Sequence, residues 1–129
     1  MGMSHVIFPV FLRCRGDKVV REFDSVEHIQ CWVEPIDVEN DEYEGWDSQG
    51  FPISLQLRGE ASIIVKLLEE PAARDEVFSA FRDFAAAEGV PFERQAKSHD
   101  LHETYQDVKK AINEARNRLP WWRKALRRI

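Results

Sequence analysis

The stretch ISLQLRGEASIIVKL, residues 53–67, carries the clearest strand signals in the chain. Ile53, Leu55 and Leu57 alternate with polar side chains, which is the period-two pattern of a strand that buries one face. A turn follows, and residues 63–68 are then apolar on both faces apart from one lysine. Such a run predicts a strand at the centre of a sheet. The stretch therefore predicts two consecutive strands joined by a turn.

Further strands are predicted on the N-terminal side of this stretch. Residues 6–14 alternate onto apolar faces and residues 19–23 form a second short strand, so that together they predict a β-hairpin. Pro9 cannot donate a hydrogen bond to a neighbouring strand, which places the first strand at an edge or introduces a bulge. Residues 35–68 read as β-rich, with an additional strand at 43–47.

A short helix is predicted between the hairpin and the β-rich region. Asp24 or Ser25 can accept a hydrogen bond from an unpaired amide at its start, and Glu27 suits the positive end of the helix. The helix is expected over residues 26–32. It cannot continue through Pro35, because the residue before a proline is restricted to extended geometry.

Two longer helices are predicted in the C-terminal half. Pro71 suits the first turn of one helix, which is expected to end at Glu88 before Gly89. Its apolar stripe contains Val77, Phe78, Phe81, Phe84 and Ala85. Ser98 can cap the next helix, whose apolar residues recur at alternating steps of four and three until Pro120. These residues are Leu101, Tyr105, Val108, Ile112, Ala115 and Leu119.

The order of the elements, with strands first and the longer helices last, predicts an α+β fold. We expect an antiparallel, meander-like sheet of about five strands, two C-terminal helices packed on one face, and a short helix after the first hairpin. The length of 129 residues fits a single domain. Residues 121–129 are expected to form an amphipathic basic tail on it.

Charge and cysteine content narrow the class of protein. A formal net charge of −5 argues against nucleic acid as a partner. Cys14 and Cys31 are too few for a disulfide framework, so we expect reduced, partly buried thiols, although one disulfide is compatible with the sequence. No apolar run approaches the ~20 residues of a membrane-spanning helix, and the first residues lack a signal-peptide pattern. The expected compartment is the cytoplasm.

The most unusual feature is an acidic segment, residues 34–47, within a stretch from 33 to 57 that contains no Lys or Arg. Acids mixed with aromatic side chains are typical of a surface that attracts and binds a basic protein. The predicted partner-binding residues are Glu39, Asp41, Glu42, Tyr43, Glu44, Trp46 and Asp47. The alternatives are a solvated loop, or an internal partner for the protein's own basic tail.

The basic tail is the second candidate surface. As a helix, residues 121–129 combine tryptophans and an apolar side with four basic residues, which is typical of a helix at a membrane surface. A helix of two turns is marginal by itself, so docking on the domain or on a partner is the competing interpretation. The residues of this alternative site are Trp121, Trp122, Arg123, Lys124, Arg127 and Arg128.

No motif for catalysis, metal binding or cofactor binding stands out. His99 and His102 lie three residues apart but match no zinc signature. Asp24, His28 and Cys31 form a local group with nucleophilic chemistry, yet Cys31 is expected in the core rather than as an exposed thiolate. The glycines are isolated and form no phosphate-binding loop. We therefore predict no catalytic residue, no metal and no cofactor.

The leading hypothesis is a non-enzymatic interaction protein whose acidic segment binds a basic protein. Its profile is similar to that of many small bacterial proteins, toxin-neutralising immunity proteins among them, although no motif carries this similarity. A peripheral membrane module that uses the tail is the second hypothesis. The third is a small-ligand binder or an enzyme whose site the sequence does not reveal.

Overall fold

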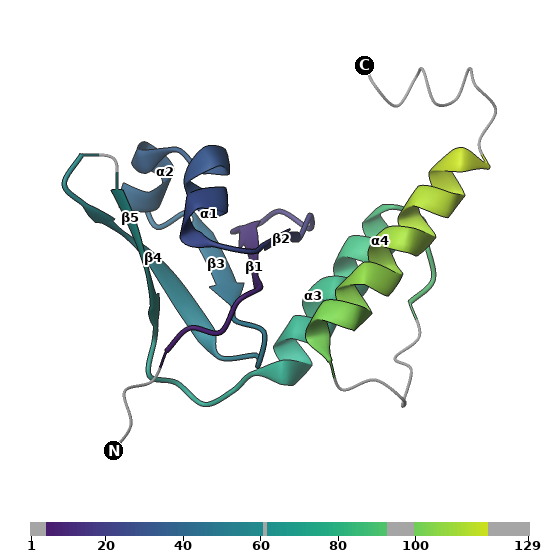
Figure 1. Ribbon diagram of the computed structural model, residues 1–129. Helices are drawn as coiled ribbons and strands as arrows, with labels where there is room; N and C mark the ends of the chain where they lie inside the picture. Colours follow the sequence, from purple (N-terminus) through teal and green to yellow (C-terminus); the bar gives the residue numbers. More distant parts are fainter. Residues whose placement is uncertain (1–4, 61, 93–99, 119–129) are drawn as a thin grey trace.

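The structure is a computed structural model, and it describes residues 5–60, 62–92 and 100–118. These residues form a sheet with helices on both of its faces (Figure 1). The strands are β1 (Val10–Cys14), β2 (Arg21–Phe23), β3 (Tyr43–Trp46), β4 (Pro52–Arg58) and β5 (Ser62–Leu67). The helices are α1 (Val26–Trp32), α2 (Pro35–Glu39), α3 (Arg74–Ala87) and α4 (Leu101–Asn117). The α+β fold predicted from the sequence is confirmed.

The five strands form one antiparallel sheet in the order β2-β1-β3-β4-β5. Strand β3 pairs with β1, with Phe11 opposite Trp46, and not with β2. The connection through α1 and α2 therefore crosses β1, and the simple meander extends only from β3 to β5. This crossover places α1 and α2 on one face of the sheet, where α1 packs against β5 and β2 and α2 packs against β4.

Two sequence predictions about strand position are wrong. Strand β5 lies at an edge, paired with β4 alone among the described strands. Its apolar side chains pack against α1 and the core on that face, which requires no second neighbouring strand. Strand β1 is internal and not at an edge. It begins at Val10, so Pro9 stays outside the ladder and needs neither an edge nor a bulge.

Helix α1 has the predicted bounds, and the Ser25 hydroxyl caps it by accepting from the backbone N–H of His28 at 3.1 Å. The start of the region predicted to be β-rich is instead the helix α2. Pro35 at its first turn explains this, since a proline that ends one helix has the right φ to begin another.

The sheet separates two hydrophobic cores. On one face, Phe11, Val20 and Trp46 pack against α3 and α4, and the Phe11 ring meets that of Phe81 edge-on with centroids 5.1 Å apart. The opposite face packs against α1 and α2. The buried residues of this second core are Val10, Leu12, Phe23, Ile29, Val33, Val38, Ile53 and Ile63.

The two long helices lie side by side on their face of the sheet (Figure 1). The predicted stripe of α3 is buried, but the helix starts at Arg74 and not near Pro71. Helix α4 is capped by Asp100, which accepts from the N–H of Glu103, while the predicted cap Ser98 lies outside the described residues. Within those residues, no helix combines the length and apolar character needed to cross a bilayer.

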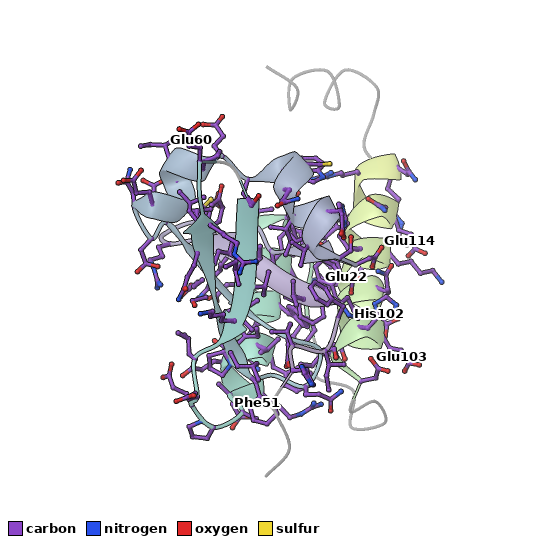
Figure 2. All side chains as sticks on the ribbon, turned by 60° about the vertical axis from the view of Figure 1, so that its left-hand side comes forward. Glu22, Phe51, Glu60, His102, Glu103 and Glu114 are labelled. Atoms are coloured by element: carbon purple, nitrogen blue, oxygen red, sulfur yellow. The ribbon has the colours of Figure 1, made fainter. Side chains whose placement is uncertain are left out.

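Helix α4 is tied to the edge strand β2 by polar contacts. The buried Tyr105 hydroxyl donates to the carbonyl of Val20 at 2.8 Å. His102 Nδ1 lies 2.6 Å from a Glu22 oxygen, and Gln106 donates to the other oxygen of the same carboxylate at 3.0 Å. Glu22 and His102 face each other across the contact (Figure 2).

Candidate functional site

Helix α2 and the turn after it form the middle of the acidic segment. Asp41 lies just after the helix with a φ of 53°, and its N–H donates to the carbonyl of Val38 at 3.1 Å. The N–H of Glu42 donates to the carbonyl of Asp37 at 3.0 Å. These bonds turn the chain directly into β3, so that a short helix and a strand end display the acidic side chains together.

The predicted partner-binding residues differ in exposure. Glu39, Asp41 and Glu42 are exposed, Tyr43 and Glu44 are half-buried, and Trp46 and Asp47 are buried. Trp46 belongs to the core beneath α3 and α4, where alternation along β3 places it. The accessible surface is therefore smaller than the sequence suggested and centres on α2.

Asp47 organises the turn between β3 and β4. Its carboxylate accepts hydrogen bonds from the backbone N–H groups of Gln49 at 2.9 Å, Phe51 at 3.0 Å and Ile7 at 3.3 Å. Three donors satisfy a carboxylate that is only 1% exposed and would otherwise be costly to bury. Its place just before a Ser-Gln-Gly turn was the available sequence signal, because Asp often bonds the N–H two residues on.

Part of the acidic charge is neutralised by the first hairpin. Arg13 forms an ion pair with Glu44, and its guanidinium lies 5.5 Å from the centre of the Trp46 ring. Arg15 reaches Asp41 at 3.4 Å and Glu44 at 3.5 Å. The sequence left open whether the acids meet the basic tail. The structure gives Asp41 and Glu44 partners in β1 and the turn that follows it.

The Asp37 carboxylate acts on three groups around it. A hydrogen bond with Asp37, and then the negative charge of Asp37, raises the pKa of Glu42. Burial and the charge of the same carboxylate raise the pKa of Tyr43, whose hydroxyl lies 3.4 Å from Asp37 Oδ2. Burial and the charges of Asp17 and Asp37 raise the pKa of Cys14. The negative charge of Asp37 contributes to all three shifts, and a cation beside this carboxylate would be stabilised.

A groove of about 640 Å³ runs between α2 and β4. Leu55 and Leu57 from β4 line it together with Val38 from α2, and all three belong to or pack against the core. Glu39 and Glu60 line its polar parts. Glu60 lies at the end of the β4–β5 hairpin beside the short helices, and Phe51 lies at the opposite end (Figure 2). An apolar floor is thus bordered by carboxylates.

Ile36 stands beside this groove as an exposed apolar side chain. It lies on α2, lines the groove and keeps 55% of its surface accessible. Glu39 follows one helical turn later on the same short helix, and the exposed Glu34 precedes the helix. An aliphatic side chain among carboxylates was not singled out from the sequence, because its exposure depends on which side of α2 faces the sheet.

Among the described residues, His28 and His102 make separate contacts and do not form one site. His102 is engaged by Glu22, and that hydrogen bond raises the pKa of His102. His99 lies outside the described residues, within which no group of three potential metal ligands is found. His28 accepts from the N–H of Asp24 at 3.2 Å and packs its ring against Phe23.

Cys14 and Cys31 are free and exposed, so the predicted partial burial is wrong. Helical spacing gives the reason for Cys31, because Ile29 and Val33 occupy the buried side of α1 and the residue midway between them points away. The alternative site in the tail, residues 121–129, lies outside the described residues.

Comparison with known proteins gives no relative. No protein-family model matches the chain, and no curated protein or solved structure is significantly similar to it.

Proposed function

We propose that this protein binds a basic protein partner through the surface formed by α2, the turn after it and the groove against β4. The observation that carries this proposal is the exposed Ile36 between a leucine-lined groove and a set of carboxylates. An apolar centre with a charged rim is the anatomy of a protein-binding surface. The carboxylates are Glu34, Glu39, Asp41, Glu42 and Glu60.

The two parts of this surface have different roles in binding. The carboxylates speed the approach of a basic surface and set its orientation, an effect that weakens when salt screens the charges. Burial of Ile36 and of the groove floor supplies contact energy that salt does not weaken. Neutralisation of a basic toxin, as immunity proteins do, is one concrete form of this function.

The test is affinity capture from a lysate of the native host, eluted with a salt gradient and quantified by mass spectrometry. The double variant Glu39→Lys/Glu42→Lys should reduce capture of the specific basic protein by about tenfold or more, because like charges then face each other. Both residues are exposed, so the fold should be unaffected.

A matched control changes the net charge equally at another place. Asp107 and Glu114 are exposed on α4, and the variant Asp107→Lys/Glu114→Lys should capture the partner like the unmodified protein. Equal loss in both double variants would mean that only net charge matters. Equal capture by all three proteins would contradict the proposal.

A further inference from the structure

A second cavity, of about 300 Å³, opens on the α1 side of the sheet. It lies between the first hairpin and the end of α1, away from the groove of the proposed partner surface. Its floor is made of Leu12, Phe23 and Val33, each at most 8% exposed. Trp32 and Tyr43 provide aromatic walls. A volume of this size is at the small end of the range for ligand pockets.

The charged side chains that line the cavity differ in the ion pairs and hydrogen bonds that they already make. Arg13 is paired with Glu44. Asp17 Oδ1 already accepts the backbone N–H groups of Lys18 at 2.6 Å and Val19 at 3.1 Å. Arg21 is different, because no carboxylate of the described residues forms an ion pair with it.

The Arg21 guanidinium lies 4.7 Å from the centre of the Trp32 ring. Stacking on an aromatic ring uses the face of a guanidinium and leaves its N–H edge available for a carboxylate. Trp32 is 57% exposed, an unusual state for the largest apolar side chain. A ligand in the cavity would cover part of this ring and meet the guanidinium beside it.

The opposite end of the cavity has a different character. Burial raises the pKa of the Cys14 thiol, the charges of Asp17, Asp37 and Glu42 raise it further, and the charge of Arg21 lowers it. A negative group would be repelled at this end and attracted at the Arg21 end. Charge is therefore distributed unevenly along the cavity, which also has an apolar floor.

We propose that this cavity binds a small organic acid with an aromatic or aliphatic body. The body would lie over Leu12, Phe23 and Val33, against Trp32, and the carboxylate would receive hydrogen bonds from Arg21. The ligand is held without covalent chemistry. The cavity shares no lining residue with the groove of the proposed partner surface, although Glu42 of that surface acts on Cys14, and it corresponds to the small-ligand alternative that the sequence left without residues.

The experiment uses 2-naphthoate as the probe and 2-naphthalenemethanol as its neutral counterpart. Binding is followed by chemical shifts of backbone and tryptophan N–H groups in the ¹⁵N-labelled protein. Naphthoate should shift the Trp32 indole and bind at least tenfold more tightly than the alcohol, since a charged hydrogen bond is worth on the order of a factor of ten or more.

Two variants test the residues. Arg21→Gln should weaken naphthoate binding about tenfold and leave binding of the alcohol unchanged. Cys14→Phe, at an exposed position on the cavity wall, should block both compounds by filling the space. Arg82→Gln is the matched control, an exposed arginine on α3 that should change neither affinity.

Three results would overturn the proposal. The first is the absence of shifts at Trp32 up to the solubility limit of naphthoate. The second is equal affinity for the acid and the alcohol, which would leave an apolar site without acid specificity. The third is unchanged naphthoate binding in Arg21→Gln or Cys14→Phe, which would place the probe elsewhere.

Discussion

The two faces of the sheet are built differently. Helices α3 and α4 cover one face with 14 and 17 residues and bury a cluster of aromatic rings. Helices α1 and α2 cover the other with 7 and 5 residues, and they leave Trp32 and Ile36 exposed. The groove and the cavity both lie on this second face.

We expect this difference between the faces to decide which variants change stability and which change binding. Long helices with a continuous apolar stripe can bury it completely, so the α3–α4 face leaves little apolar surface exposed. Helices of two turns or fewer cannot cover a five-stranded sheet, and the gaps beside them become the hollows a partner or ligand can enter. Variants of buried residues on either face should therefore change stability, and variants of the exposed residues on the second face should change binding.

The largest effect is expected in the aromatic cluster. Phe81 is fully buried, and its ring contacts those of Phe11 and Tyr105. Phe81→Ala should lower the free energy of unfolding by about 3–5 kcal/mol, because it removes apolar contacts and leaves a cavity. Urea denaturation measures this, with the exposed neighbour Arg82→Ala as control. A loss below about 1 kcal/mol would break the distinction between the faces.

The buried turn residue should have the next largest effect. Asp47→Ala leaves the N–H groups of Ile7, Gln49 and Phe51 without their acceptor. We expect a loss of about 2–3 kcal/mol in denaturation experiments. Asp47→Asn keeps one carbonyl oxygen and should lose less. If Asp47→Ala were as stable as the unmodified protein, Asp47 would be available to the partner surface after all.

A smaller effect is expected from pH at the contact between α4 and β2. The pKa of His102 is raised in the folded protein, chiefly by its hydrogen bond with Glu22. The ion pair therefore contributes fully below the pKa of an unfolded histidine, about 6.5, and its contribution is lost as pH rises through the higher folded pKa. Since the His102 side chain is 45% exposed, solvent screening limits the change to about 0.5 kcal/mol.

Denaturation curves from pH 5.5 to 8.5 measure this dependence. His102→Gln and Glu22→Gln should each remove the same part of the pH profile, and the double variant should remove no more than either alone. If the double variant lost more of the pH dependence than either single variant, the two side chains would contribute to it independently.

The smallest effect on stability is expected at Ile36. The side chain is already exposed, so Ile36→Ser should change the free energy of unfolding by less than about 0.5 kcal/mol. Partner affinity should nevertheless fall by about 1–2 kcal/mol, because the contact at the centre of the surface is lost. Isothermal titration with the captured protein measures this. Strong destabilisation without loss of affinity would reverse the assignment of the two faces.

Most elements could be predicted from the sequence, because their signals are local. The alternation of residues 53–57, the cap at Ser25 and the apolar stripe of α3 depend only on neighbours in the chain. Strand order could not be predicted, because β3 pairs with β1 across two intervening helices. Strand β5 was expected at the centre because its residues are apolar on both faces, and this pattern does not reveal how many strands pair with it.

The candidate site was predicted only in part. Acidic composition identified the segment, and Glu39, Asp41 and Glu42 are exposed in it. Trp46 is buried because of the face of β3 on which it lies, and Asp47 because of the turn after that strand. Charge alone indicates neither. The exposed Ile36 and the cavity at Arg21 arise where separate elements meet, so no local pattern in the sequence marks them.

Hydrogen–deuterium exchange of the protein alone and with the captured basic partner tests the central claim most directly. We predict that the partner slows exchange in residues 34–42 and 55–60, while amides of α3 and α4 exchange as they do in the free protein. Protection confined to α3 and α4, with none in α2 or β4, would contradict the assignment of binding to the acidic face.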